Sequence, residues 1–266
     1  MSKPGHHAAP AQELVRRIQA FDDEHREALR RLWFLGDVHG EFRHIVRCLA
    51  AAPVRPAWLV FLGDLDLELR PFRDWVDALQ SAHPGVQVAF IHGNHDADTH
   101  GHWQRLHDCG SAVRLHAQLL DLDGVRVAGL GGVFMGRVWS PPAEARVQHR
   151  RQLDPALMTA LEKRERQGPK LMGAIYPAEW ERLSRQGADI LVTHEAPTCH
   201  PHGFEAIDEL ARAMGVVRTF HGHHHDDRSD EYVARRDALG FDAWSVAFCA
   251  IRNGLGELLV QGEPGW

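Results

Sequence analysis

The sequence predicts an α/β protein in which short buried strands alternate with helices. Two observations support this class. Five short apolar runs are each followed at once by residues that commonly bind metals, and helix-prone stretches lie between most of these runs. The residues that follow the runs are Asp37-Val38-His39, Gly63-Asp64, Gly93-Asn94-His95-Asp96, Thr193-His194 and Gly222-His223-His224-His225. Because open α/β sheets bind ligands at the carboxyl ends of their strands, we expect these side chains to meet in one site.

The first half of the chain supplies three of the five runs. After a disordered tail over residues 1–10, the apolar spacing predicts helices and strands in alternation. The helices are expected over 11–30, 41–52 and 71–82, and the strands over 31–35, 58–62 and 86–91. Pro53 ends the second helix because proline has no backbone N–H, and Pro71 suits the first turn of the third helix.

The second half combines two hairpins, an insertion and the last two runs. Alternating apolar residues over 118–130 surround Asp123-Gly124, which is typical of a two-residue hairpin turn. Residues 136–186 interrupt the rhythm of strands and are predicted to be a helical insertion in a single domain that spans residues 11–266. Strands are expected over 190–193 and 216–220, and a closing hairpin over 243–251 and 257–260.

The composition predicts a soluble cytoplasmic protein. The chain has 266 residues, 44% of them hydrophobic, and a net charge of −6, so no basic field draws it to nucleic acid or to an anionic membrane. Its four cysteines are widely spaced and form no CxxC pair, which favours a reducing compartment. The first ten residues have no apolar core of a signal peptide, and no apolar stretch reaches transmembrane length.

The residue types after the five runs indicate a two-metal hydrolase. Carboxylate, amide and imidazole ligands form a mixed oxygen and nitrogen set, which suits Mn, Fe, Zn or Ni. Two metal ions about 3.5–4 Å apart need a bridging carboxylate, and Asp64 is the natural bridge because it directly follows a buried strand and a glycine. Asp37 and His39 can face one ion across a sharp turn, and His223 and His225 share one face of an extended segment.

The order Asp-x-His, Gly-Asp, Gly-Asn-His-Asp, His and Gly-His-x-His resembles the calcineurin-like metallophosphoesterase family. These motifs run from Asp37 to His225. The resemblance implies a sandwich of two mixed β-sheets flanked by helices, with a dinuclear metal site at the strand ends. It also implies that one metal is held by Asp37, His39, Asp64 and His225, and the other by Asp64, Asn94, His194 and His223.

The same resemblance assigns His95 as a general acid beside the leaving group, and Asn94 and His95 as substrate-binding residues. An imidazole with a pKa near ~6.5 is well matched to protonating an alkoxide. Many members have Gly-Asp-x-x-Asp, whose last Asp orients this histidine, but here Leu67 stands in that place. Three other carboxylates could take over the orienting role, namely Asp66, Glu68 and Asp96, and we expect Asp96 to be catalytic together with His95.

The expected activity is metal-dependent phosphoester hydrolysis, in which a hydroxide that bridges two divalent or trivalent metal ions attacks phosphorus. We favour manganese as the metal and a small phosphorylated substrate, such as a nucleotide, with a phosphodiesterase or small-molecule phosphatase activity. A Ser/Thr-type protein phosphatase is disfavoured because His92 stands where such enzymes have arginine, and Arg70 lies too far along the chain. The remaining alternative is a non-catalytic metal-binding regulatory module on the same fold.

Overall fold

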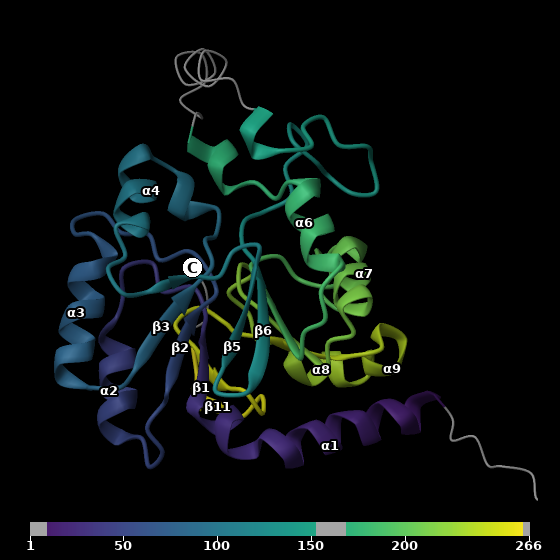
Figure 1. The fold of residues 1–266 in the computed structure, drawn as a ribbon, viewed down its shortest axis with the longest axis horizontal. Helices are drawn as coiled ribbons and strands as arrows, with labels where there is room; N and C mark the ends of the chain where they lie inside the picture. Colours follow the sequence, from purple (N-terminus) through teal and green to yellow (C-terminus); the bar gives the residue numbers. More distant parts are fainter. Residues whose placement is uncertain (1–9, 153–168, 263–266) are drawn as a thin grey trace, which may run out of the picture.

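Two mixed β-sheets pack face to face in the computed structural model, which describes residues 10–152 and 169–262 (Figure 1). The larger sheet has the strand order β11-β10-β1-β2-β3-β4 and the smaller sheet the order β5-β6-β7-β8-β9. The strands are β1 (Leu32–Leu35), β2 (Trp58–Phe61), β3 (Gln87–Phe90), β4 (Val113–Arg114), β5 (Gln118–Leu122), β6 (Val125–Leu130), β7 (Ile190–Thr193), β8 (Arg218–His221), β9 (Asp242–Ser245), β10 (Ile251–Asn253) and β11 (Leu258–Val260). The predicted α/β sandwich of two mixed sheets flanked by helices is confirmed.

Helices cover the outer face of each sheet. In Figure 1, α2, α3 and α4 lie beside the larger sheet, α6 and α7 lie beside the smaller one, and α1 crosses below both. The helices are α1 (Pro10–Arg31), α2 (Arg43–Ala51), α3 (Phe72–Ala82), α4 (His100–His107), α6 (Pro177–Ser184), α7 (Glu205–Met214), α8 (Ser229–Val233) and α9 (Arg236–Leu239), with short 3₁₀ helices η1 (His95–Ala97), η2 (Arg150–Gln152) and η3 (Pro169–Gly173). None of these described helices is long and apolar enough to cross a membrane.

The central strands β1, β2, β7 and β8 are buried on both faces because each sheet lies between helices and the other sheet. In β1, Phe34 belongs to the core between the sheets, whereas Trp33 and Leu35 belong to the core under α2 and α3. Phe34 stacks on Phe220 of the opposite sheet, with ring centroids 4.0 Å apart. Burial on both faces explains why the sequence shows continuous apolar runs and not an alternating pattern.

Parallel strands bring the expected site residues to one edge. β1, β2 and β3 are parallel neighbours in the larger sheet, and β7 and β8 are parallel neighbours in the smaller sheet. The loop after β1 is bonded to the loop after β2, since the His39 N–H donates to the Asp64 carbonyl at 3.0 Å. The five ligand-bearing loops therefore open at the same end of the sandwich.

The predicted closing hairpin was partly wrong. Residues 243–251 were expected to form one strand, but they belong to two strands in different sheets. β9 lies parallel to β8 in the smaller sheet, and β10 lies antiparallel to β1 in the larger sheet. Residues 246–250 connect the two sheets and are buried, so an apolar pattern alone could not separate the crossing from a continuous strand. Of the three strands in this last part of the chain, β10 and β11 form the hairpin.

Two expectations fall partly outside the described residues. The predicted tail over 1–10 is described only at Pro10, where α1 begins. Of the helical insertion predicted over 136–186, residues 153–168 lie outside the described part of the chain. The described part of the insertion contains turns, η2, η3 and α6.

Candidate metal centre

Four of the expected ligands have a backbone conformation that L-amino acids rarely adopt. The φ angles are 41° at His39, 49° at Asp64, 74° at His223 and 58° at His225. A residue other than glycine in this left-handed region costs on the order of 1–3 kcal/mol, and such strain is concentrated at functional sites. The turns after β1, β2 and β8 thus aim these side chains inward at a cost in local free energy.

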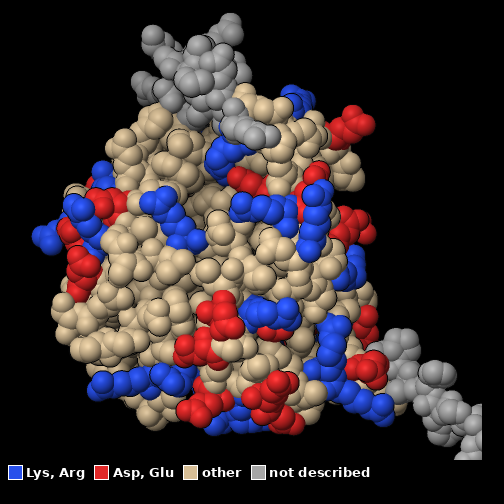
Figure 2. Space-filling view, viewed as in Figure 1, with Lys and Arg blue, Asp and Glu red and all other residues tan. Residues whose placement is uncertain are grey.

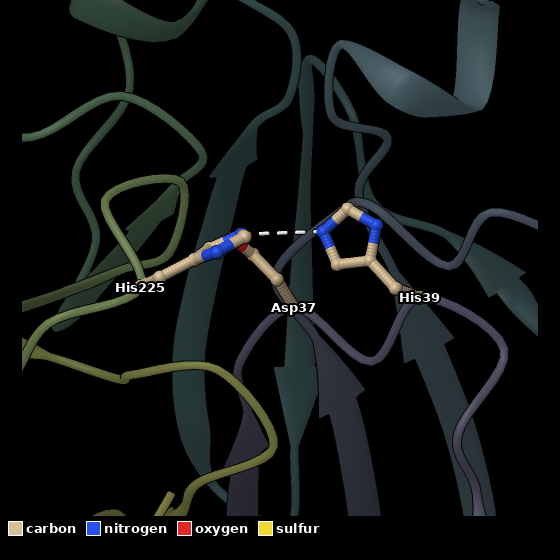
Figure 3. A group of neighbouring side chains, drawn as sticks. All are labelled: Asp37, His39 and His225. Carbon is tan, nitrogen blue, oxygen red and sulfur yellow. Dashed lines mark hydrogen bonds and ion pairs between the residues drawn. The ribbon is translucent and has the colours of Figure 1, made fainter. Parts of the chain in front are cut away.

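Asp37, His39 and His225 form the first group of possible metal ligands (Figure 3). The Asp37 Oδ2 atom lies 3.1 Å from His225 Nε2, and the two Nε2 atoms of His39 and His225 lie 3.2 Å apart. Asp37 is completely buried, and both imidazoles are partly exposed. One carboxylate oxygen and two imidazole nitrogens therefore converge within reach of a single ion.

Asp64, His194 and His223 form the second group. The Asp64 Oδ2 atom lies 3.4 Å from His194 Nε2, and the Asn94 Oδ1 atom lies 3.1 Å from the same nitrogen. His194 Nδ1 donates to the Leu62 carbonyl at 2.8 Å, so its Nε2 atom is the one left for a metal ion. The amide oxygen of Asn94 thus adds a fourth ligand atom to this group.

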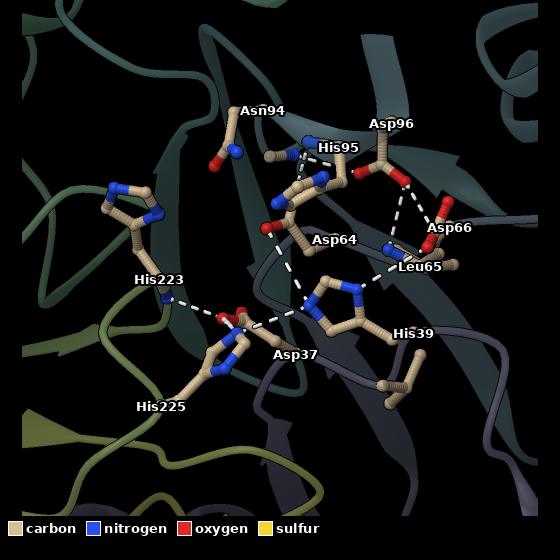
Figure 4. A network of polar contacts seen from close by, with 12 residues as sticks. Asp37, His39, Asp64, Leu65, Asp66, Asn94, His95, Asp96, His223 and His225 are labelled. Atoms are coloured by element: carbon tan, nitrogen blue, oxygen red, sulfur yellow. Dashed lines mark hydrogen bonds and ion pairs between the residues drawn. The ribbon is translucent and has the colours of Figure 1, made fainter. Parts of the chain in front are cut away.

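Asp64 lies between the two groups (Figure 4). Its Oδ2 atom is 4.0 Å from His39 Nε2 in the first group and 3.4 Å from His194 Nε2 in the second. Its Oδ1 atom accepts the backbone N–H of His95 at 2.8 Å, which fixes the orientation of the carboxylate. This is the placement that a carboxylate shared by two ions requires.

Glycines in the motifs make room for the ligand side chains. A Cβ atom at Gly93 would lie 2.2 Å from Asp64 Oδ1, and one at Gly222 would lie 2.4 Å from Asp37 Oδ1. These distances are far below van der Waals contact, so any larger residue would displace a ligand. Gly93 and Gly222 therefore have a steric reason to be glycines.

The charge balance of the site fits two metal ions. Asp37 and Asp64 are almost fully buried, and Asp37 Oδ1 has no hydrogen-bond partner. Burial acts to lower the pKa of His194, but the nearby charges of Asp64 and Asp37 raise it to about 10. Burial, followed by the neighbouring His194, lowers the pKa of His223 to about 3, so that its imidazole is neutral, as a metal ligand must be. Two buried carboxylates demand positive charge nearby, which metal ions would supply.

The carboxylate that contacts His95 is Asp98. His95 Nδ1 donates to Asp98 Oδ2 at 2.7 Å. Because η1 is a single helical turn, a residue three positions after His95 comes to the same side. The spacing His95-x-x-Asp98 was therefore the sequence signal for this partner, and it was missed.

Asp96 has a different role from the predicted one. Its Oδ1 atom accepts the backbone N–H groups of Leu65 and Asp66, and its Oδ2 atom accepts that of Gly93 (Figure 4). The side chain is buried, so it joins the loops after β2 and β3. The prediction that Asp96 orients His95 is therefore corrected: the carboxylate that contacts the His95 ring belongs to Asp98.

Asp66, another proposed orienting residue, contacts two other histidines. Its Oδ2 atom is 3.5 Å from His39 Nδ1, and its Oδ1 atom is 3.2 Å from His102 Nδ1 at the start of α4. Asp66 therefore holds the ring of a possible ligand, His39, and does not replace the missing carboxylate at Leu67.

An open cavity adjoins the first ligand group. It has a volume of about 530 Å³, and its lining includes His39, Asp66, Phe42 and Trp75. On the face of the molecule in Figure 2, acidic and basic side chains are interspersed, and neither sign forms a continuous field.

Fold and site together define a mixed α/β sandwich with candidate metal-ligand groups at its strand ends. A family model described as calcineurin-like phosphoesterase matches residues 30–227. The chain belongs to this family, in which metal ions are used to hydrolyse phosphoesters.

Individual relatives are similar over most of the chain. A Haemophilus influenzae protein described as uncharacterized is 35% identical over 234 residues, which make up 86% of this chain and 96% of that protein. A solved crystal structure with 11% identity has a TM-score of 0.46 and covers 84% of this chain and 95% of its own. The 5'-nucleotidase of Candida albicans, also 11% identical, has a TM-score of 0.38 and covers 84% of this chain and 47% of its own.

Proposed function

We propose that this protein hydrolyses phosphoesters of small molecules with two metal ions, one in each ligand group. The observation that carries the proposal is the position of Asp64 between Asp37, His39 and His225 on one side and His194, His223 and Asn94 on the other. When bound, the ions would supply Lewis acidity to the phosphoryl oxygens and lower the pKa of water. Manganese is our first choice, with Fe, Zn and Ni as alternatives, because the ligands are oxygen and imidazole nitrogen.

His95 is the proposed general acid. Its Nδ1–H is held by Asp98, which leaves Nε2 to face the substrate, and its ring lies 5.2 Å from that of His39 between centroids. In its imidazolium form His95 carries a proton on both ring nitrogens. As the phosphorus–oxygen bond breaks, Nε2 gives its proton to the leaving oxygen, so that the alcohol departs uncharged and the ring keeps the Nδ1–H that Asp98 holds. Asn94 would help to bind the substrate beside the second ligand group.

A phosphodiester or a nucleotide is the proposed substrate class. His92 occupies the place of a phosphate-binding arginine, and its ring packs against Trp103 and His116 at centroid distances of 5.0 and 4.4 Å. A diester carries less charge than a monoester and therefore needs an arginine clamp less. This preference also argues against a Ser/Thr-type protein phosphatase.

The alternative of a non-catalytic metal-binding module loses its main support. It rested on Leu67, which replaces the carboxylate that usually orients the catalytic histidine. Because Asp98 contacts His95 Nδ1 at 2.7 Å, an orienting carboxylate is present from another position. A cytoplasmic location is part of the proposal, since Cys48, Cys109 and Cys199 form no disulfide, as in a reducing compartment.

The test is the hydrolysis of bis(p-nitrophenyl) phosphate and p-nitrophenyl phosphate by manganese-reconstituted protein. Asp64→Asn removes the shared carboxylate and is expected to lower turnover more than about 100-fold. Asp230→Asn, an exposed change on α8, is the matched control and should leave the rate unchanged. Turnover of the diester supports the phosphodiesterase preference, and turnover of the monoester alone reverses it. A near-wild-type rate in Asp64→Asn would contradict the mechanism.

A further inference from the structure

We propose that Lys170, on the inserted segment, is a positioning residue for catalysis that acts on His95 through Asp98. The inference rests on the proposed function, in which His95 is the general acid. It gives the insertion a direct part in the reaction, which neither the motifs nor the family assignment provides.

Asp98 is held at both of its carboxylate oxygens. Its Oδ2 atom accepts from His95 Nδ1 at 2.7 Å, and its Oδ1 atom lies 3.0 Å from Lys170 Nζ. The side chains of all three residues are partly exposed, with relative accessibilities of 44% for His95, 29% for Asp98 and 47% for Lys170. A carboxylate this exposed would move between rotamers if only one oxygen were held, and catalytic groups need a supporting contact to stay in place.

The missing family carboxylate makes this support necessary. Leu67 occupies its place and is buried in the apolar core under α2 and α3. Asp98 reaches His95 from the same short loop, so that its backbone offers less independent support than a separate strand end would. Lys170 supplies the second point of attachment from outside that loop.

The segment that carries Lys170 is fixed directly against η1. A Cβ atom on Gly173 would lie 2.9 Å from the Ala97 Cβ atom and 3.3 Å from the Gly93 carbonyl oxygen, so η3 touches the catalytic loop through a bare glycine. The Gly173 carbonyl also accepts the Val133 N–H at 3.0 Å. Lys170 is thus held at a set place relative to His95.

A second anchor is Arg150, just before the undescribed residues 153–168. Its guanidinium donates to the carbonyls of Met172 and Ala174, pairs with Glu179 at 3.0 Å and lies over the Tyr176 ring at 4.7 Å. These contacts hold both the end of η3 and the start of α6. The backbone around Lys170 is therefore supported independently of its side chain, and replacing that side chain should leave η3 in place.

Turnover of a series of phosphodiesters with leaving groups of increasing pKa tests the proposal. Lys170→Met is expected to lower kcat about tenfold for alkyl leaving groups and less than about twofold for p-nitrophenolate, because only poor leaving groups need protonation. KM and bound metal should stay unchanged. Lys170→Arg keeps the charge and should restore most of the rate. The matched control is Arg73→Met, an exposed change on α3 that removes the ion pair of Arg73 with Asp108, and its rates should equal those of wild type.

A measurement without turnover separates this inference from the proposed function. In long-range ¹H–¹⁵N spectra of the metal-free protein, the His95 ring should show one tautomer with a proton on Nδ1, assigned by its loss in His95→Gln. Lys170→Met should mix the two tautomers, and Lys170→Arg should not. This readout holds even if wild-type protein hydrolyses none of the esters, an outcome that would count against the proposed function alone.

Two results would overturn the role of Lys170. One is an equal loss of rate for all leaving groups together with a raised KM, which would mean that Lys170 binds the substrate directly. The other is an unchanged leaving-group dependence with an unchanged His95 tautomer, which would mean that its contact with Asp98 has no effect.

Discussion

Asp96 and Asp98 lie two positions apart, yet their surroundings give them different tasks. Asp96 is buried and accepts three backbone N–H groups from two loops, whereas Asp98 is partly exposed and contacts the His95 ring. Burial, reinforced by the nearby charge of Asp64, raises the pKa of Asp96 to about 6. Asp96 thus holds the loops after β2 and β3 together, and Asp98 binds the imidazole of His95.

Replacing each of the two by alanine should separate these tasks. Asp96→Ala leaves buried backbone N–H groups without partners and should lower the free energy of unfolding by about 1–3 kcal/mol for each such group. Asp98→Ala should cost less than about 1 kcal/mol, since it breaks partly exposed contacts, but should lower kcat about 10- to 100-fold for poor leaving groups. Urea unfolding and steady-state kinetics on both variants measure this. Equal losses of stability would contradict the assignment.

At the scale of elements, α6 is attached to the sheet through Glu179. This side chain contacts His116 Nε2 at 3.2 Å and Arg150 Nε at 3.0 Å, and it accepts the Tyr176 N–H at 3.2 Å, which begins the helix. Burial acts to raise the pKa of Glu179, but His116 and Arg150 lower it to about 2. One carboxylate therefore joins α6, the segment before it and the loop that carries His116.

The lowered pKa predicts how stability depends on pH. Because the pKa of Glu179 is lower in the folded protein than its ordinary value of 4.5, its ionised form stabilises the fold above about pH 4.5. Glu179→Gln should lower the free energy of unfolding at pH 7 by about 1.5–3 kcal/mol, as expected for hydrogen bonds to a charged group. The difference from wild type should shrink as the pH falls from about 5 towards 2. Glu181→Gln, an exposed change on the same helix, should show no such trend in urea unfolding.

At the scale of the whole molecule, the two sheets meet around a centre that concentrates negative charge. Asp37 and Asp64 are buried at the junction, and the backbone is strained at Asp64 itself and at the three histidines His39, His223 and His225. Bound metal ions would neutralise the buried carboxylates, and their bonds to the ligands would offset the backbone strain. The stability of the whole fold should therefore depend on metal binding.

Thermal unfolding measures this dependence. A ligand at 100 times its Kd adds about 2.7 kcal/mol, which for a protein of this size raises Tm by roughly 5–10 °C. Manganese should produce such a rise and EDTA should reverse it. Asp37→Ala should reduce the rise, because it removes a ligand of the first group, whose Oδ1 atom has no hydrogen-bond partner, and leaves the second group intact. A full rise in that variant would show that the first group contributes nothing to manganese binding.

Much of this architecture could be predicted from the sequence. Five strands, β1, β2, β3, β7 and β8, are each followed by a recognisable ligand residue. Gly93 and Gly222 are needed beside Asp64 and Asp37, so local pattern and site agree. The crossing at residues 246–250 could not be predicted, because a segment buried in a connection has the same apolar pattern as one buried in a strand. Nor could the contact between Lys170 and Asp98 be predicted, since 71 residues lie between them in the chain and no local pattern encodes how the insertion folds back.

The pairing of β1 with β10 has a consequence for biosynthesis. Leu35 pairs with Ile251, and the Cys249 N–H donates to the Asp37 carbonyl at 2.9 Å, so β1 cannot complete its pairing until a strand that is translated much later has been made. Until then β1 has an open edge in the nascent chain, where foreign strands or chaperones can attach. Contacts this distant in sequence also slow folding. The loops of the candidate metal centre can therefore reach their final arrangement only after β10 has been made, so any metal would be bound late in folding.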